Sequence, residues 1–277
     1  MKPQHKGNDW LYQAPPVNDI DMIEAYFAGH AYDPHRHDTY AIGRTYSGVQ
    51  SFHYRGALRN SLPGGTMVLH PDEVHDGHAG NPEGFLYRMM YVEPALIQQV
   101  LEGKPLPFIK GGLTDNGRLS NAVNTLLRSM DIPLEPLEKE DALYDLAMAM
   151  NEASGARDST RRFDYAAAQR AREMIDVSLH RPLTLAELSS HANRDRWGLS
   201  RDFRQVFGTS PHRYQIMRRL DIVKRCLVRG MDLADASLIA GFFDQSHMSR
   251  HFSHAFGLPP GKWQKIATAA LIGIRKR

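Results

Sequence analysis

The chain has 277 residues, of which 42% are hydrophobic and 23% are charged, a composition typical of a soluble globular protein with two domains. No run approaches the roughly 18 apolar residues that a membrane-spanning helix needs, and the first thirty residues contain no signal-peptide core. The single cysteine, Cys226, excludes an intrachain disulfide and fits a reducing compartment. We therefore expect a cytoplasmic protein without a membrane partner.

The net charge of +3 hides an asymmetry between the two halves of the chain. Residues 1–155 contain 12 Lys and Arg against 20 Asp and Glu, whereas residues 156–277 contain 22 against 11. A basic half joined to an acidic half indicates that only the C-terminal part meets a polyanion. A solvated basic surface is the alternative.

Residues 33–93 are predicted to form short β-strands. Runs such as TYAIGRTY, GTMVLH and FLYRMMYV are rich in β-branched and aromatic residues. Turn signals such as Pro63-Gly64-Gly65 separate them. Strands at roughly ten-residue spacing without intervening helices indicate a β-sandwich or barrel rather than a parallel sheet.

Two helices are predicted after the strands. The first carries apolar residues at helical spacing between Leu119 and Met130, and the second runs from about Leu137 to Ala153. Pro133 breaks the chain between them, which gives a helical hairpin. The apolar face of the hairpin is wide enough to pair with its copy in a homodimer, and the alternative is that it packs on its own barrel.

These patterns divide the chain into four parts and predict a two-domain α+β protein. The polar, Gly-containing stretch SGARDSTRRFD is interpreted as a linker, and everything beyond it has helical periodicity. The parts are a β-barrel over residues 1–112, the helical hairpin over 113–153, the linker over 154–164 and an all-α domain over 165–277.

One motif occurs twice in the all-α domain, 49 residues apart. Its copies, Ser200–Pro211 and Ser249–Pro260, both read S-R-x-F-x-x-x-F-G-x-x-P. The two phenylalanines face the core from one helix side, the glycine supplies a left-handed C-cap, and the proline begins the next helix. A short helix and a tight turn precede each copy, so each copy is the second helix of a helix-turn-helix unit.

The second helix of each unit presents polar side chains at its N-terminal end. Such a helix fits the major groove, where Arg pairs with guanine, Gln pairs with adenine and apolar groups pack on thymine. The alternative is that Trp197 belongs to the core and that Arg201 and Arg250 bind carboxylates inside the fold. We expect double-stranded DNA to be contacted by Arg196, Trp197, Ser200, Arg201, Arg204, Gln245, Ser246, His247 and Arg250.

Residues 166–266 resemble the DNA-binding domain of the AraC/XylS family of bacterial regulators. The most specific stretches are AGFFDQSHMSRHF (Ala240–Phe252) and the closing FGLPP. The resemblance implies seven helices in two helix-turn-helix units, bridged by a long helix from Pro211 to about Val228. It also implies that the base-reading positions are those named above, apart from Arg204.

The first unit departs from the family pattern at two positions. Arg194 stands where an aliphatic residue normally fills the turn. Gly198 lies inside the recognition helix, where glycine costs about 1 kcal/mol relative to alanine. The contacts of the first unit are therefore less closely fixed by the resemblance than those of the second.

Residues 33–93 resemble the cupin-like effector-binding domain that many members of this family carry. The matching residues include the run Pro34-His35-Arg36-His37, then Pro63-Gly64 and His75. Alternate residues of a strand face the same side, so a cupin barrel would bring the three histidines to its interior. The resemblance also suggests that Trp10 to Pro16 folds over the pocket as an arm. We expect a small polar metabolite to be bound by His35, His37, Tyr40, His75 and Arg88, and the alternative is that these are surface or internally satisfied side chains.

Two histidines at i and i+2 with a third nearby can hold zinc or iron. Metal-binding cupins also place a Glu a few residues after the second histidine, and here the chain has Tyr40-Ala41-Ile42. Asp38 is predicted to point to the face opposite His37. We therefore favour a site with no metal and no other cofactor, with a metal at His35, His37 and His75 as the alternative.

The leading interpretation is a sequence-specific transcriptional regulator that responds to a small-molecule effector. Its partners would be double-stranded DNA, the effector, a second copy of the chain and, for an activator, RNA polymerase. One alternative is a metal-dependent cupin enzyme fused to a DNA-targeting module, against which the missing carboxylate argues, so we expect no enzymatic activity. Another is a regulator without a ligand. The effector, the operator and the choice between activation and repression stay open.

Overall fold

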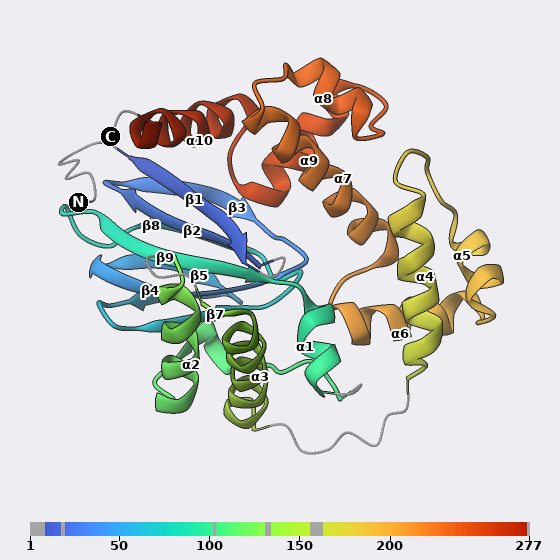
Figure 1. Ribbon diagram of the computed structural model, residues 1–277, viewed down its shortest axis with the longest axis horizontal. Coiled ribbons are helices and arrows are strands. Elements are labelled where there is room, and N and C mark those ends of the chain that lie inside the picture. The colour runs from blue at the N-terminus through green and yellow to red at the C-terminus, as the bar shows by residue number, and fades with distance from the viewer. Residues whose placement is uncertain (1–8, 18–19, 102–103, 131–133, 156–162, 276–277) are drawn as a thin grey trace.

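The computed structural model describes residues 9–17, 20–101, 104–130, 134–155 and 163–275. A β-rich part with a few helices (the β-domain, up to residue 155) is followed by an all-helical part (the helical domain, from residue 163), as Figure 1 shows. The predicted two-domain α+β class is confirmed. None of the helices within these residues is both long and apolar enough to cross a membrane. Most of the predicted linker, residues 156–162, lies outside the described residues.

Two antiparallel sheets form the β-domain. Their strand orders are β1-β2-β9-β4-β7-β10 and β3-β8-β5-β6. The predicted strands between residues 33 and 93 are present, and the chain adds an edge hairpin before them that the sequence interpretation did not contain. The strands are β1 (Trp10–Val17), β2 (Ile20–Phe27), β3 (His30–His35), β4 (Tyr40–Gly48), β5 (Gln50–Tyr54), β6 (Ala57–Ser61), β7 (Thr66–Leu69), β8 (His75–Ala79), β9 (Phe85–Val92) and β10 (Leu113–Thr114).

Residues Trp10–Pro16, expected to form an arm, belong to edge strand β1. This strand pairs antiparallel with β2, with Trp10 opposite Tyr26, and β2 pairs with β9. Helix α10 (Pro260–Arg275) lies along the outer edge of β1. Residues Trp10–Val17 are thus built into the sheet, and their position is fixed by backbone pairing.

The central strands of the larger sheet are buried on both faces. On the face toward the smaller sheet, Ala41 and Met89 pack with Phe52. On the opposite face, Ile42 and Met90 pack against helices. Burial of this kind removes the apolar–polar alternation that normally reveals which face of a strand points inward.

The predicted helical hairpin consists of α2 (Gly117–Arg128) and α3 (Pro136–Ala153). The side chain of Asn116 caps α2 by accepting from the Leu119 amide. Leu119, Val123 and Leu146 share one core with the larger sheet, together with residues of α1 (Pro94–Leu101). The hairpin therefore uses its apolar face within one chain, as one of the two alternatives foresaw.

The helical domain contains the seven predicted helices, all within the described residues. Two hydrophobic cores hold them: Phe203 and Phe207 lie in the first, and Phe252 and Trp263 lie in the second. The long helix α7 contributes to both cores and so joins the two units. Besides α10, the helices are α4 (Tyr165–Val177), α5 (Leu185–Ala192), α6 (Arg196–Phe207), α7 (Pro211–Val228), α8 (Leu233–Ile239) and α9 (Gln245–Phe256).

The ends of α6 and α9 follow the repeated motif. Asp195 caps α6 by accepting from the Gly198 amide, and Asp244 caps α9 by accepting from the His247 amide. Each helix ends at a left-handed glycine, Gly208 with φ 69° and Gly257 with φ 65°. The glycine ends are those that the sequence predicts, and the aspartate caps fix where each recognition helix begins.

The two departures of the first unit have a local cause. A Cβ on Gly198 would lie 2.3 Å from the Asp195 carboxylate, so the glycine makes room for the N-cap of its own helix. Arg194 donates from Nε to Asp202 Oδ2 at 2.9 Å. This ion pair joins the turn to α6, at the position where the family pattern has an aliphatic residue.

Candidate functional site

The N-terminal ends of α6 and α9 are open to solvent. Trp197 is 72% exposed and therefore lies outside the core. Among the described residues, neither Arg201 nor Arg250 forms an ion pair, and both are exposed. Ser200 is half-buried and accepts a hydrogen bond from Arg204, whose guanidinium is exposed. The remaining exposed side chains of the predicted DNA-contacting set are Arg196, Gln245 and Ser246.

His247 differs from the other predicted contacts because it is half-buried. Its Nε2 lies 3.0 Å from Nε2 of His251, one turn further along α9. Its ring also packs edge-on against Phe242. One ring nitrogen of His247 thus has an internal partner, and the other, Nδ1, is buried without one among the described residues. In this arrangement neither nitrogen is offered to a DNA base.

The sequence interpretation missed one exposed side chain at this surface. Phe243 is 92% exposed in the turn directly before the N-cap of α9, whereas its neighbour Phe242 is buried in the second core. Two adjacent phenylalanines in a turn cannot both enter the same core, so one of them had to face solvent. The pattern alone did not indicate which.

A cavity of about 110 Å³ lies between the β-domain and helices α7, α9 and α10. The β-domain contributes an apolar and aromatic wall together with three buried histidines. The helical domain closes the other side through side chains of three helices. Lining residues include Leu11, Ile23, Tyr32, His35, His37, Phe52, His75, Tyr87, Met89 and Tyr91 from the first domain, and Met217, Arg218, Lys224, Phe256 and Trp263 from the second.

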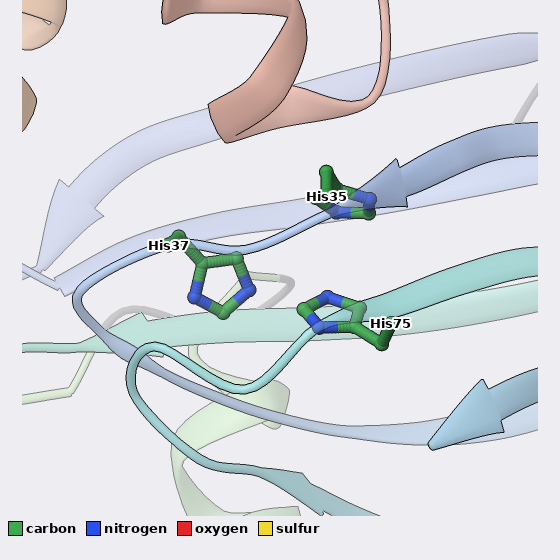
Figure 2. Close-up of side chains that lie close together, drawn as sticks. All are labelled: His35, His37 and His75. Carbon is green, nitrogen blue, oxygen red and sulfur yellow. The ribbon is translucent and has the colours of Figure 1, made fainter. Parts of the chain in front are cut away.

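The three predicted histidines do come together, and we call His35, His37 and His75 the His triad. One ring nitrogen from each lies within 4.8 Å of the others. Figure 2 shows the rings turned toward one another: His35 is the last residue of β3, His37 lies in the chain just after it, and His75 is the first residue of β8. His35 and His37 face the same side because alternate residues of an extended chain do, as the sequence predicted. The antiparallel pairing of β3 with β8 places His75 opposite His35.

Burial keeps the His triad neutral. It lowers the pKa of His35 to about 3, with a further contribution from the nearby His75. Burial also lowers the pKa of His37 well below its ordinary value, and that of His75 as well. Uncharged imidazole is therefore the form present near neutral pH.

Tyr40 and Arg88, also predicted to line the pocket, lie on the other face of the larger sheet. The Tyr40 hydroxyl donates to the carbonyl of Pro107 at 2.8 Å. Arg88 donates to Glu24 at 2.5 Å in a buried ion pair. Their neighbours Ala41 and Met89 line the cavity instead. The structure thus does not bring these two residues to the site, because adjacent residues of a strand face opposite sides.

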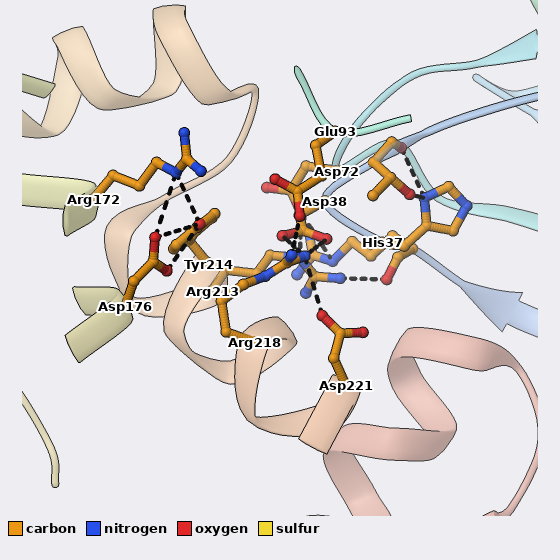
Figure 3. Close-up of polar contacts among 12 residues, drawn as sticks. His37, Asp38, Asp72, Glu93, Arg172, Asp176, Arg213, Tyr214, Arg218 and Asp221 are labelled. Carbon is orange, nitrogen blue, oxygen red and sulfur yellow. Dashed lines mark hydrogen bonds and ion pairs between the residues drawn. The ribbon is translucent and has the colours of Figure 1, made fainter. Parts of the chain in front are cut away.

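Three cations of α7 pair with carboxylates of the β-domain. Arg213 Nε lies 2.6 Å from Asp72, and Lys224 Nζ lies 3.1 Å from Asp21. Arg218 pairs with Asp38 at 3.1 Å and with Glu93, which Figure 3 shows in the centre of the interface. Three positive charges of the central helix are thus matched by carboxylates of the acidic half of the chain, which links the charge asymmetry of the sequence to the packing of the two domains.

Asp38 is buried within this interface. Burial raises the pKa of Asp38 to about 6, against the opposing effect of the Arg218 guanidinium. The sequence predicted that Asp38 faces away from His37, but not that a helix of the other domain would meet it there. Its partner could not be recognised, since the two residues are 180 positions apart.

The backbone around the two histidines also binds the helical domain. The amide of Asp33 donates to the carbonyl of Gly257 at 3.3 Å, and that of Arg36 donates to the carbonyl of His254 at 3.1 Å. These carbonyls belong to the C-terminal end of α9. Within the 33–38 segment, His35 and His37 thus line the cavity, while the amides of Asp33 and Arg36 hold α9 and the carboxylate of Asp38 holds α7.

Family models match both domains of the chain. The AraC-like ligand-binding domain matches residues 17–147, and a helix-turn-helix domain matches residues 188–266. Together the two matches cover most of the sequence. They fall on the β-domain with its hairpin and on the helices that carry the repeated motif.

Individual relatives are similar over different parts of the chain. The probable transcriptional regulator LumQ of Photobacterium leiognathi is 31% identical over 91 residues, which are 32% of this chain and 37% of that protein. The chain thus matches little more than a third of that relative's length. The uncharacterized HTH-type transcriptional regulator YbfI of Bacillus subtilis is 24% identical over 82% of this chain and 86% of that protein.

A solved structure has the same arrangement of domains. Wild-type ToxT from Vibrio cholerae, crystallised with an unsaturated fatty acid, superimposes with a TM-score of 0.63 at 10% identity, over 96% of this chain and 99% of that chain. At this identity the likeness shows the fold alone. With a ligand-binding domain and a double helix-turn-helix domain in the expected order, the chain belongs to the AraC family of transcriptional regulators.

Proposed function

We propose that the chain binds specific double-stranded DNA through α6 and α9, and that a small molecule in the interdomain cavity weakens this binding by holding the two domains together. The observation that carries the proposal is the composition of the cavity. Its walls come from both domains, including α7, which joins the two DNA-binding units. A ligand in this cavity contacts the β-domain and the DNA-binding helical domain at the same time.

The DNA surface follows from exposure and chemistry. The N-terminal ends of α6 and α9 present arginine, glutamine, serine and tryptophan side chains to solvent. These side chains suit the donor and acceptor pattern of the major groove. Two such helices in one chain would occupy successive turns of the groove, as in other double helix-turn-helix readers.

In this structure the helical domain is packed against the β-domain, an arrangement we call the docked state, and these contacts limit how the DNA-binding helices can move. Three cations of α7, Arg213, Arg218 and Lys224, are paired with Asp72, Asp38 and Asp21, so these three are not free for phosphate contacts. The end of α9 is tied to the 33–38 segment by backbone hydrogen bonds. Release of the helical domain from the β-domain would free both the three α7 cations and the end of α9. Because these groups are then available to DNA, DNA binding competes with docking.

The effector stabilises the docked state because only that state completes its binding site. A ligand shifts an equilibrium by its differential affinity for the two states. Without the helical domain, the cavity loses the wall formed by α7, α9 and α10. The effector is therefore a compound whose addition lowers the affinity for DNA.

The size and lining of the cavity limit the class of effector. An engineered cavity of about 150 Å³ accepts one benzene molecule, and this cavity measures about 110 Å³. A small metabolite with a polar group fits these dimensions in the docked state, whereas a long acyl chain such as the fatty acid bound by ToxT does not. Its polar group would meet the His triad or the cations of α7.

Three further assignments belong to the same proposal. The chain acts as a homodimer on paired sites, contacts RNA polymerase where it activates, and works in the cytoplasm where the DNA is. It has no catalytic role, in keeping with relatives that are regulators. None of these assignments is needed for the central proposal.

The proposal is tested by selecting DNA from a random pool with the full chain and measuring the affinity of the selected sequence by fluorescence anisotropy. We expect binding that weakens steeply with salt, because lysines and arginines displace counterions from phosphates. The variant Arg250→Ala should lose specific affinity, while Arg128→Ala, an exposed arginine of α2, serves as the charge-matched control. Failure of folded protein to enrich any sequence would refute the proposal.

A further inference from the structure

The hydrogen bonds of the His triad fix which nitrogen of each ring is available. Nδ1 of His35 lies 2.8 Å from the Asp33 carbonyl, Nδ1 of His37 lies 2.9 Å from that of Thr39, and Nδ1 of His75 lies 3.0 Å from that of Glu73. A carbonyl oxygen only accepts, so each Nδ1 carries the hydrogen. In a neutral ring, Nε2 then holds a lone pair.

The three lone pairs lack a donor among the described residues that form the site. Nε2 of His37 is buried with no hydrogen-bond partner. An unsatisfied buried acceptor is costly, and three acceptors turned toward one another cannot satisfy each other. A single cation, or a group with several hydrogens, can serve all three at once.

We propose that the His triad binds one divalent transition-metal ion through the Nε2 atoms of His35, His37 and His75, with an open coordination position toward the interdomain cavity. Backbone carbonyls that hold Nδ1–H are the usual means of orienting histidine ligands. Binding itself does not depend on the proposed DNA-binding function.

The donor set selects the class of metal. Imidazole nitrogens suit zinc, iron, cobalt, nickel and copper, whereas magnesium and calcium need oxygen ligands. The nearby carboxylates have other partners: Asp76 pairs with His53 at 2.8 Å and Asp38 pairs with Arg218. The absent glutamate, which led the sequence interpretation away from a metal, leaves a three-histidine site with an open position, an arrangement that zinc adopts.

Binding has a geometric consequence for the 33–38 segment. Nitrogens that share one tetrahedral zinc at about 2.1 Å lie roughly 3.4 Å apart, whereas the ring nitrogens here are spread over up to 4.8 Å. Closing that gap brings the segment with His35 and His37 toward His75 on β8. If the proposed function holds, this movement alters the hydrogen bonds from Asp33 and Arg36 to α9, and an effector with an anionic donor group completes the coordination of the metal.

The test is a titration of the chelator-treated full chain with Co²⁺ and Zn²⁺, without DNA. We expect one equivalent of Co²⁺ to give the visible absorption of a low-symmetry nitrogen site, and Zn²⁺ to displace it. His37→Gln should lower the metal affinity by about 100-fold or more, on the scale that altered metal sites show. His191→Gln, in which an exposed histidine of α5 far from the triad is replaced, should bind as the wild type does.

Two further measurements keep the test decisive. A His247→Gln/His251→Gln variant removes the histidine pair of α9 and should retain the metal. Nitrogen NMR of the unmodified chain should show three imidazoles with Nδ1–H whose Nε2 signals shift on adding Zn²⁺, which requires no triad variant to fold. Absence of stoichiometric binding, or binding unchanged in His37→Gln, overturns the metal site. DNA selection by the chelator-treated chain is scored separately, so a failed metal site and a failed DNA-binding function give different results.

Discussion

The two helix-turn-helix units share a motif but differ in how they meet the β-domain. Both recognition helices end at a left-handed glycine that abuts it: a Cβ on Gly208 would lie 2.7 Å from Pro71, and one on Gly257 would lie 2.9 Å from the Asp33 carbonyl. Only the end of α9 is also hydrogen-bonded there, through Asp33 and Arg36. The end of α9 is thus tied by backbone hydrogen bonds to the segment that carries two cavity histidines, whereas the first unit shares its core with Ala95 of α1.

The two helix-turn-helix units therefore have the same fold but different contacts with the rest of the chain. The first unit is stabilised within itself, through the Arg194–Asp202 pair and the Asp195 cap. The second unit has its half-buried histidine pair and its contacts with the 33–38 segment. The cavity therefore contacts α9 directly, through Ala255 and Phe256, whereas no residue of α6 lines it.

The largest effect is expected from removing the aromatic core of either unit. Phe203 and Phe252 are fully buried, and truncation of such a ring costs about 3–5 kcal/mol. Urea unfolding of Phe203→Ala and Phe252→Ala should each show a loss in this range. Only Phe252→Ala should also perturb Trp263, whose ring lies 5.7 Å from that of Phe252. A loss of unfolding free energy below about 1 kcal/mol would mean that Phe203 and Phe252 do not lie in the hydrophobic cores of the two units.

Acid should destabilise the chain through the His triad. In the unfolded chain a histidine titrates near pH 6.5, while in the fold the pKa of His35 is about 3, so the unfolded state binds more protons between these values. The stability from His35 is complete above pH 6.5 and falls by about 1.4 kcal/mol per pH unit as the pH drops toward 3.

The raised pKa of Asp38 acts in the opposite direction. Its folded form gains a proton near pH 6, so from pH 6 to pH 4 this one carboxyl offsets part of the loss from three histidines. Urea unfolding from pH 7 to pH 4.5 should show a net decline that is shallower in His35→Gln. A variant with the same slope as the wild type would show that the ring is not buried neutral.

A smaller effect is expected from the base-reading arginines. Arg250→Ala should weaken specific DNA binding by about 1–3 kcal/mol and relax the preference at one base position. Arg201→Ala makes the matched change in the first unit and should relax a different position. Anisotropy with single-base variants of the selected site measures both. An unaltered affinity for either variant would exclude that arginine from base contact.

The smallest effect is expected from the interdomain ion pair of Lys224 and Asp21. Both groups keep partial contact with solvent, where such a pair contributes about 1 kcal/mol or less. Asp21→Asn should raise the DNA affinity by up to about fivefold, because it loosens docking without touching the DNA surface. Asp115→Asn, in the exposed loop before α2, is a control with no expected change. A decrease in DNA affinity would argue that docking assists binding.

Much of the helical domain could be predicted from the sequence because its signals are local. The caps at Asp195 and Asp244 and the glycine ends of α6 and α9 depend on side chains within one turn of each helix end. The same holds for the alternation that places His35 and His37 on one side. Such features need no knowledge of distant packing.

The cavity could be predicted only in part, for two physical reasons. Tyr40 and Arg88 were wrongly assigned to the pocket, whereas their strand neighbours Ala41 and Met89 line it. These strands are buried on both faces, so their sequences show no apolar–polar alternation that would tell which residues face the cavity. The contacts of Asp38 and Lys224 depend on docking of domains that are far apart in sequence. Neither a motif nor a periodicity reports such a contact.

The central claim, that docking to the β-domain competes with DNA binding, is tested most directly by hydrogen exchange of the Asp33 and Arg36 amides. These amides donate to α9 only when the domains are docked. Saturation with the selected DNA should increase their exchange, while amides of β9 in the core stay protected. Unchanged protection of Asp33 and Arg36 in the DNA complex would contradict the account.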